Sequence, residues 1–391
     1  MKLNELKRKL ILYRERMESL RYVSGKNFAC ARADGGILLV THECSKSGAP
    51  ALLLHIAETM ASSGISVAFC ARSLGDLTQD MAKVGPVFYC PSKTALTFAA
   101  TKLRDAGYSR AIINSVASAP ILPDDSAWPF DKTLFLVHEL PGVIRYLHLE
   151  DDAKRALTLR CTYVFPSSFV RDRYFEVIGE PENHLVKPQA AYEAKNSAAV
   201  LSRAEIAEKY QIPDDRPWVL NVAKAEVRKG FDYFLDLAAM NPSYEWIWVG
   251  KSDSSMLAEA LERNGVSEFP NVTLTGYVPF NEVGSHFAAS DVFALTSRED
   301  PFPSVVLEAF SAGTPVVAFD GNGGYTDVVI DGKTGFLVDS GDLTSFSSKL
   351  ARLLNDEDLA DGIKRNCRKC VESNTFQGYV ETLLSLLELP S

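Results

Sequence analysis

Long apolar stretches are absent from this 391-residue sequence. No run approaches the roughly 18 residues that a membrane-spanning helix needs. The N-terminus carries charged side chains where a secretory signal peptide would have its apolar stretch. These absences argue against a membrane-spanning helix and predict a cytoplasmic protein.

An excess of positive charge is also absent. The chain has 41 Lys and Arg residues against 50 Asp and Glu residues, which gives a formal net charge of -9. A surface that binds polyanions needs clustered Lys and Arg side chains. Nucleic acid is therefore not an expected partner.

Cysteine is scarce and odd in number, with seven residues. Most of them lie in apolar, strand-like stretches, where cysteine behaves as a small hydrophobic residue. Cys367 and Cys370 form a lone CxxC in a charged helical stretch, without a second pair or a nearby histidine. We expect neither a disulfide framework nor a zinc site.

An alternation of β-rich runs and helical stretches begins after residue 35, which is typical of parallel sheets covered by crossover helices. The predicted strands are residues 37–43, 65–72, 86–90, 109–115, 133–139 and 161–168, and then 218–223, 244–250, 272–276, 292–297, 315–320 and 335–340. The chain is too long for one hydrophobic core, so we predict two doubly wound α/β units in tandem. No strand is followed by an intact G-x-G-x-x-G that opens a helix, which argues against a dehydrogenase.

The boundary between the units is marked by Lys187-Pro188, a small polar run and the helix candidate SRAEIAEKY. We predict four parts: a basic N-terminal helix (1–30), a first Rossmann-like domain (31–190), a second Rossmann-like domain (191–373) and a closing helix (374–391).

Residues 1–26 differ in charge from the rest, with eight basic against three acidic side chains, a local balance of +5. Apolar residues from Leu3 to Leu20 repeat at spacings of three and four, which predicts an amphipathic helix. Such a helix can pack on its own domain, lie on a membrane surface or meet a partner helix. We expect a docking element, at a membrane or at a partner.

The most informative segment is SREDPFPSVVLEAFSAGTPVVAFD, residues 297–320. A strand is predicted to end at Ser297, and a proline-containing loop then holds Asp300. Ser304 is placed to cap the helix that follows.

The first amides of this helix belong to Val305 and Val306. Amides at a helix start have no intrahelical acceptor and favour an anion such as phosphate. Glu308 lies one turn beyond Ser304 on the same face, where it is suited to accept hydrogen bonds from hydroxyl groups. The alternative is a strand, loop and helix with solvated acids.

This segment resembles the E-x(7)-E motif of glycosyltransferase family 4. Members of that family have the GT-B fold, two Rossmann-like domains facing each other across a cleft, and transfer a sugar from a nucleotide-sugar donor with retention of anomeric configuration. The resemblance implies that Asp300 faces the donor sugar and that Glu308 binds the nucleotide ribose. The chain departs from the motif by an aspartate at the first position, followed by Pro-Phe-Pro where Gly-Phe-Gly is commoner.

A lysine-containing loop adds to the resemblance. NVAKAEVRKGF, residues 221–231, is similar to the family's loop in which Arg and Lys bind the donor diphosphate, which implies that role for Lys224 and Lys229. Cations suit a diphosphate that gains negative charge as the glycosidic bond breaks. The resemblance covers most of residues 186–345. It includes GYVPF (276–280), which corresponds to the family's stretch that contacts the base. It also includes Asp327, where the family usually has a Glu.

The first half resembles the family more loosely. Gly48 follows the first strand, where the family has a glycine-rich loop near the donor diphosphate. His138 lies at the end of the predicted strand 133–139, where many members place a histidine beside the donor sugar. Ligands bind outside the carboxyl ends of such strands. We assign catalytic roles to His138 and Asp300, which would stabilise an oxocarbenium-like transition state.

The leading hypothesis is a retaining glycosyltransferase that moves a sugar from a nucleotide-sugar donor to a glycan or lipid-linked acceptor, in bacterial cell-surface polysaccharide assembly of O-antigen or capsule type. No cofactor and no metal are expected, because the sequence offers no DxD-like pair at a strand end and no histidine cluster. The alternatives are a nucleotide-sugar epimerase or hydrolase of the same fold, and an inactive module that scaffolds an assembly complex.

Overall fold

The computed structural model of the chain describes residues 35–190, 201–302, 304–372 and 374–389. The chain divides into two compact units, one formed by Met1–Pro188 together with Gln377–Ser391 and the other by Gln189–Phe376. The basic helix expected over residues 1–26 lies outside the described residues.

The first unit is built on a seven-stranded parallel sheet with the strand order β3-β2-β1-β4-β5-β6-β7. Its strands are β1 (Gly36–Thr41), β2 (Val67–Ala71), β3 (Val87–Tyr89), β4 (Tyr108–Asn114), β5 (Lys132–Leu136), β6 (Thr162–Phe165) and β7 (Asn183–Val186). Its helices are α2 (Gly48–Ser62), α3 (Thr78–Val84), α4 (Lys93–Asp105), α5 (Pro141–Tyr146), α6 (Glu150–Ala156), α7 (Ser168–Val177), α15 (Phe376–Leu386) and the short η1 (Val116–Ile121) and η2 (Asp125–Ala127).

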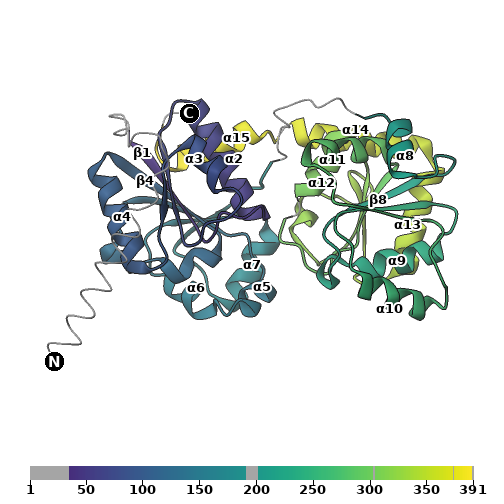
Figure 1. Cartoon of the computed structure of the whole chain (residues 1–391), viewed down its shortest axis with the longest axis horizontal. Helices are drawn as coiled ribbons and strands as arrows, with labels where there is room; N and C mark the ends of the chain where they lie inside the picture. The colour runs from purple at the N-terminus through teal and green to yellow at the C-terminus, as the bar shows by residue number, and fades with distance from the viewer. Residues whose placement is uncertain (1–34, 191–200, 303, 373, 390–391) are drawn as a thin grey trace. The chain divides into compact units, whose positions relative to one another are not determined.

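The second unit is built on a six-stranded parallel sheet with the strand order β10-β9-β8-β11-β12-β13. Its strands are β8 (Trp218–Val222), β9 (Glu245–Val249), β10 (Val272–Gly276), β11 (Val292–Leu295), β12 (Val316–Phe319) and β13 (Gly335–Val338). Its helices are α8 (Arg203–Tyr210), α9 (Phe231–Met240), α10 (Ser254–Asn264), α11 (Phe280–Ala289), α12 (Ser304–Ala312), α13 (Leu343–Asn355), α14 (Glu357–Glu372) and the short η3 (Val227–Lys229) and η4 (Gly324–Asp327). Helices flank the sheet in each unit (Figure 1).

The two predicted doubly wound units and all the predicted strands are confirmed. The sequence analysis missed β7, which pairs with β6 at the edge of the first sheet. Its four residues are exposed or only partly buried, so its sequence lacks the apolar run that marks the inner strands.

Side-chain caps fix several helix starts. Ser92 and Ser167 accept hydrogen bonds from the third amide of α4 and α7. Ser202 and Glu205 form a reciprocal capping box at the start of α8. Such caps satisfy amides that have no partner within the helix, and each contributes about 1 kcal/mol.

The core of the second unit is rich in aromatic side chains. Trp218, Trp246 and Trp248 on strands β8 and β9 are fully buried. Phe234 of α9 lies edge-on to Trp246 and Trp248, with ring centroids 5.2 and 5.1 Å apart. These contacts hold α9 on the sheet and so fix the loop that precedes it.

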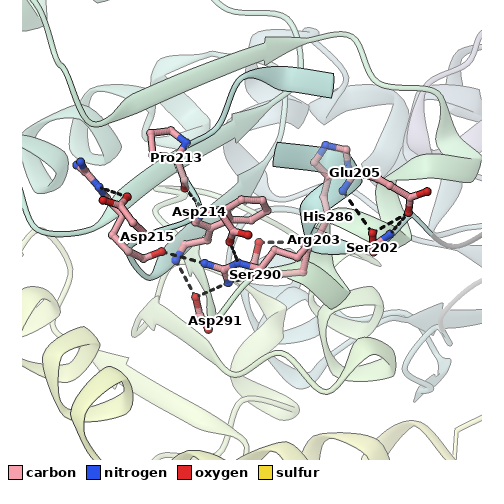
Figure 2. Close-up of polar contacts among 12 residues, drawn as sticks. Ser202, Arg203, Glu205, Pro213, Asp214, Asp215, His286, Ser290 and Asp291 are labelled. Carbon is pink, nitrogen blue, oxygen red and sulfur yellow. Dashed lines mark hydrogen bonds and ion pairs between the residues drawn. The ribbon is translucent and has the colours of Figure 1, made fainter. Parts of the chain in front are cut away.

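Arg203 anchors the start of α8 to the amino ends of β8 and β11 (Figure 2). Its guanidinium lies 4.3 Å from the centre of the Trp218 ring. It donates hydrogen bonds to the carboxylates of Asp214 and Asp291 and to the backbone carbonyls of Ala289 and Arg216. Asp291 also accepts a 2.8 Å hydrogen bond from the amide of Trp218. This network joins one helix to two strands at the sheet edge remote from the strands' carboxyl ends.

Within the segment predicted as the closing helix, α15 spans Phe376–Leu386, and the chain from Gln377 onward belongs to the first unit. The chain beyond it is held there by Arg110 of β4, whose Nε donates to the Leu387 carbonyl at 2.8 Å, and by an ion pair between Lys132 and Glu388.

Candidate functional site

The carboxyl ends of β8, β11 and β12 lie side by side in the second sheet. The chain connects β8 to β9 on one side and β11 to β12 on the other, so the strand order reverses between β8 and β11. Loops at such a reversal form the ligand-binding crevice of open parallel sheets. Here the loops are residues 223–230, 296–302 and 320–323.

Lys229 and Asp300 meet at this edge. The Lys229 ammonium and the Asp300 carboxylate form an ion pair, and the hydroxyl of Ser297 donates to the same carboxylate at 3.3 Å. Asp300 is 4% exposed. Two residues that sequence analysis assigned separately are thus direct partners.

The backbone of Asp300 is held by the glycine-rich stretch after β12. Its amide donates to the Asn322 carbonyl at 2.9 Å, and its carbonyl accepts from the Gly324 amide at 3.1 Å. A Cβ atom on Gly323 would lie 2.1 Å from the Asp300 carbonyl oxygen, so this close approach requires glycine.

Arg298, which sequence analysis missed, joins the loop that carries Asp300 to the segment around Lys229. Arg298 forms a two-point ion pair with Asp232 at 2.6 and 2.7 Å, stacks 3.6 Å from the centre of the Tyr233 ring, and donates to the Val227 carbonyl at 2.7 Å. An arginine within an acidic loop gave no signal of this role, because its partners are distant in sequence.

Helix α12 begins four residues after Asp300. The sequence analysis placed Ser304 as the cap before the helix, whereas the structure makes it the first helical residue. Its side chain forms a hydrogen bond with Glu308 one turn later. Val305 and Val306 follow in the first turn, whose amides have no intrahelical acceptors.

Glu308 is a partly buried carboxyl group on α12. Burial raises its pKa to about 7, and the hydrogen bond with Ser304 opposes that shift. At neutral pH, desolvation therefore leaves this group poised between its neutral and charged forms.

Lys224 is not brought to Asp300. Its ammonium pairs with Glu226 at 2.7 Å, and its side chain is 67% exposed. Tyr277 of the predicted base-contacting stretch is 80% exposed, and Asp327 is an exposed residue at the end of η4. Of the two predicted lysines, only Lys229 therefore contacts Asp300.

In the first unit, His138 follows β5 and lies beside the end of β4. Its Nε2 is 2.8 Å from the side-chain oxygen of Asn114. Burial lowers the pKa of His138, and the nearby charge of Glu139 opposes this.

Glu139 is a buried carboxylate that sequence analysis left without a role. It accepts hydrogen bonds from the Ser115 hydroxyl and from the amides of Val116 and His138. Ser115 has a backbone φ of 75°, an uncommon conformation for a residue other than glycine. Such strain clusters at functional sites. The sequence around Glu139 gives no signal of these contacts, because the pairing with Ser115 and Val116 forms only when the chain folds.

Gly48 is the first residue of α2, directly after Ser47. A Cβ atom at this position would meet no atom within 4 Å, so the packing of the first unit does not require a glycine there.

Within residues 35–190, 201–302, 304–372 and 374–389, no helix is long and apolar enough to cross a membrane. Over the same ranges, no group of three or more His, Cys, Asp and Glu side chains is arranged to hold a metal ion.

Two Rossmann-like units in one chain are the components of the GT-B fold. The chain superposes on the solved structure of HepE from Anabaena in complex with UDP-glucose with a TM-score of 0.74 and 17% sequence identity, over 90% of this chain and 99% of that chain. At this level of identity the likeness establishes the fold.

Residues 202–370 match the family model described as glycosyl transferases group 1. The chain is similar to an alpha-D-kanosaminyltransferase of Streptomyces kanamyceticus, with 27% identity over 188 residues, 47% of this chain and 48% of that protein. It is also similar to the lipopolysaccharide core biosynthesis glycosyltransferase LpsE of Rhizobium meliloti, with 28% identity over 156 residues, 39% of this chain and 43% of that protein. The chain spans about half the length of the curated relatives it matches. The match to the family model includes Lys229, Asp300 and Glu308.

Proposed function

We propose that this protein is a glycosyltransferase that uses a nucleotide-diphosphate sugar as its donor. The observation that carries the proposal is the Lys229–Asp300 pair at the carboxyl edge of the second sheet. Asp300 lies four residues before the start of α12. Lys229 and Asp300 both lie in the segment that matches the glycosyltransferase family model. HepE, which shares the fold, was solved with UDP-glucose bound.

The donor diphosphate would lie against Lys229 and the first amides of α12, where the cation and the helix dipole offset its charge. An incoming diphosphate would compete with Asp300 for the Lys229 ammonium. The freed Asp300 carboxylate would then face the sugar. Glu308 in its charged form would accept hydrogen bonds from the ribose hydroxyls.

We also propose transfer with retention of anomeric configuration and without a divalent metal. The positive charge that a metal would supply to the leaving diphosphate comes here from Lys229 and from the helix amides. LpsE is a glycosyltransferase of lipopolysaccharide core biosynthesis. We propose a polysaccharide or lipid-linked acceptor for this chain.

The test is to incubate the whole chain with a panel of nucleotide sugars, with and without acceptor glycans, and to follow donor consumption and the anomeric configuration of the product by proton NMR. Lys229→Ala and Glu308→Ala should each lower transfer at least tenfold, equivalent to about 1.4 kcal/mol of lost transition-state stabilisation. Lys209→Ala is the matched control, because Lys209 forms an exposed ion pair with Glu282 on α11.

Wild-type transfer rates in both site variants would overturn the donor-site assignment. EDTA should leave the rate unchanged. Complete loss with EDTA, restored by magnesium or manganese, would contradict the metal-independent part of the proposal.

A further inference from the structure

Asn114 lies at a junction of three elements in the first unit. It is the last residue of β4, is fully buried, and pairs in register with Thr41 of β1 and Leu136 of β5. Its side-chain nitrogen donates to the Ala49 carbonyl in the first turn of α2 at 2.9 Å. Its side-chain oxygen lies 2.8 Å from His138 Nε2.

These two contacts fix the orientation of the amide. A backbone carbonyl only accepts hydrogen bonds, so the amide atom that faces Ala49 must be the NH₂ group. The amide atom that faces His138 is then the oxygen, which also only accepts. His138 Nε2 must therefore carry a proton. In the neutral imidazole, which burial favours, Nδ1 is then the nitrogen without a proton.

We propose that Asn114 is a positioning residue: its amide bridges α2 and His138 and fixes the imidazole as the tautomer with its proton on Nε2. The catalytic consequence rests on the proposed function, because His138 is assigned to the sugar side of the donor site. The tautomer itself does not depend on that function.

The surroundings of the pair support this role. The Asn114 carbonyl accepts a 2.7 Å hydrogen bond from the hydroxyl of Ser118, and the strained Ser115 follows directly. The amide of His138 donates to Glu139 at 3.1 Å. The backbones on both sides of the contact are thus held, while the amide itself is oriented by its own contacts with Ala49 and His138.

The charged and titratable groups that influence His138 are Glu139, which raises the pKa of the imidazole, and His42 after β1, which lowers it. Burial has the larger effect and lowers the pKa. A neutral amide at position 114 adds no charge that would favour the imidazolium, whereas a carboxylate there would favour it.

The primary experiment is long-range ¹H–¹⁵N NMR on the whole chain labelled with ¹⁵N-histidine, with the His138 signals assigned by their loss in His138→Gln. The sequence has 6 histidines, so the spectrum is simple enough to assign. At neutral pH, Nε2 should be protonated and Nδ1 unprotonated. A His138 spectrum of the other tautomer, or of an equal mixture, would overturn the proposal.

Variants extend the test. Asn114→Asp should raise the pKa of His138 by at least one unit and move the acidic limb of the kcat profile with it. Asn114→Leu should abolish the tautomer preference and lower kcat at least tenfold, with the donor KM changed less than twofold. Ser118→Ala is the matched control, because it removes a buried hydrogen bond at the backbone of Asn114 and leaves the amide contacts in place.

If Asn114→Leu fails to fold, the wild-type spectrum and the Asn114→Asp titration still decide the question. An unchanged His138 pKa in Asn114→Asp, or an equal change in Ser118→Ala, would show that Asn114 is only structural. A correct tautomer in a chain that transfers no sugar would uphold the positioning role and reject the proposed function.

Discussion

Glu308 joins stability and function in one side chain. Its pKa is raised from 4.5 to about 7. Between these two pH values the folded state therefore keeps a proton that the unfolded state has lost. The resulting stability is fully present below about pH 4.5 and is lost as the pH rises through about 7. The proposed donor binding needs the charged form, since the ribose hydroxyls would donate to it.

Glu308→Gln should therefore raise the melting temperature relative to the wild type more at pH 8 than at pH 5, by about 3 °C or more. Nucleotide affinity should fall in the same variant. Differential scanning fluorimetry at both pH values gives the first result, and Glu262→Gln on an exposed face of α10 is the control. Equal shifts at the two pH values would show that Glu308 is not the titrating group.

The Lys229–Asp300 pair predicts opposite effects on binding and turnover. In Asp300→Asn the Lys229 ammonium loses its charged partner, so a nucleoside diphosphate no longer competes with a carboxylate for it. Affinity for the nucleoside diphosphate should rise at least threefold, while sugar transfer falls at least tenfold. Calorimetry and turnover assays measure the two quantities.

The control for this prediction is Asp236→Asn, because Asp236 pairs with Arg263 on the surface helices α9 and α10. Weaker nucleoside diphosphate binding in Asp300→Asn would mean that Asp300 organises the site and does not compete for Lys229.

At the scale of elements, Arg203 shows how one side chain fixes a helix to a sheet. Arg203→Ala would leave the Asp214 and Asp291 carboxylates without their cation (Figure 2). It would also remove the stack on Trp218. We expect a loss of about 2 kcal/mol, or roughly 4 to 8 °C in melting temperature. Transfer at low temperature should be unchanged, since the network lies at the amino ends of the strands.

Arg216→Ala is the matched control, because its side chain lies 3.5 Å from the carboxylate of the exposed Asp215. A melting temperature for Arg203→Ala within 1 °C of this control would contradict the anchoring role.

The elements were largely predictable because their signals are local. Inner strands such as β1 and β12 read as continuous apolar runs, and Ser202 with Glu205 marks a helix start. The strand β7 was missed because an exposed edge strand carries no such run.

The site was predictable only in part. Lys229 and Asp300 were each identified from their segments, but their pairing depends on two loops that meet at a strand reversal. The pairing of Arg298 with Asp232 and that of Asn114 with His138 were also not predictable, because the two residues of each pair are 66 and 24 residues apart in sequence. Ser304 was placed one position outside its helix, where local rules are least accurate.

At the scale of the whole molecule, charge is unevenly distributed. Residues 1–26, which lie outside the described residues, carry a balance of +5 in a chain of net charge -9. We propose that they dock the protein at an anionic membrane or at a partner helix. Each Lys or Arg near an anionic surface contributes about 1 kcal/mol, so several suffice for reversible binding.

Deletion of residues 1–26 should abolish sedimentation with anionic liposomes, or change the oligomeric mass in light scattering, and leave transfer to a soluble acceptor nearly unchanged. A full-length chain that neither binds liposomes nor associates, together with a truncated chain that unfolds, would place the segment in the core of the first unit.

The central claim is that the carboxyl edge of the second sheet binds a nucleoside diphosphate through Lys229. The most direct measurement is calorimetric titration of UDP, GDP and ADP into the whole chain and into its Lys229→Ala and Lys209→Ala variants. We predict saturable binding of at least one of the three nucleotides, a dissociation constant at least tenfold larger in Lys229→Ala, and an unchanged constant in Lys209→Ala. Binding of none of them, or equal affinity in the wild type and Lys229→Ala, would contradict the account.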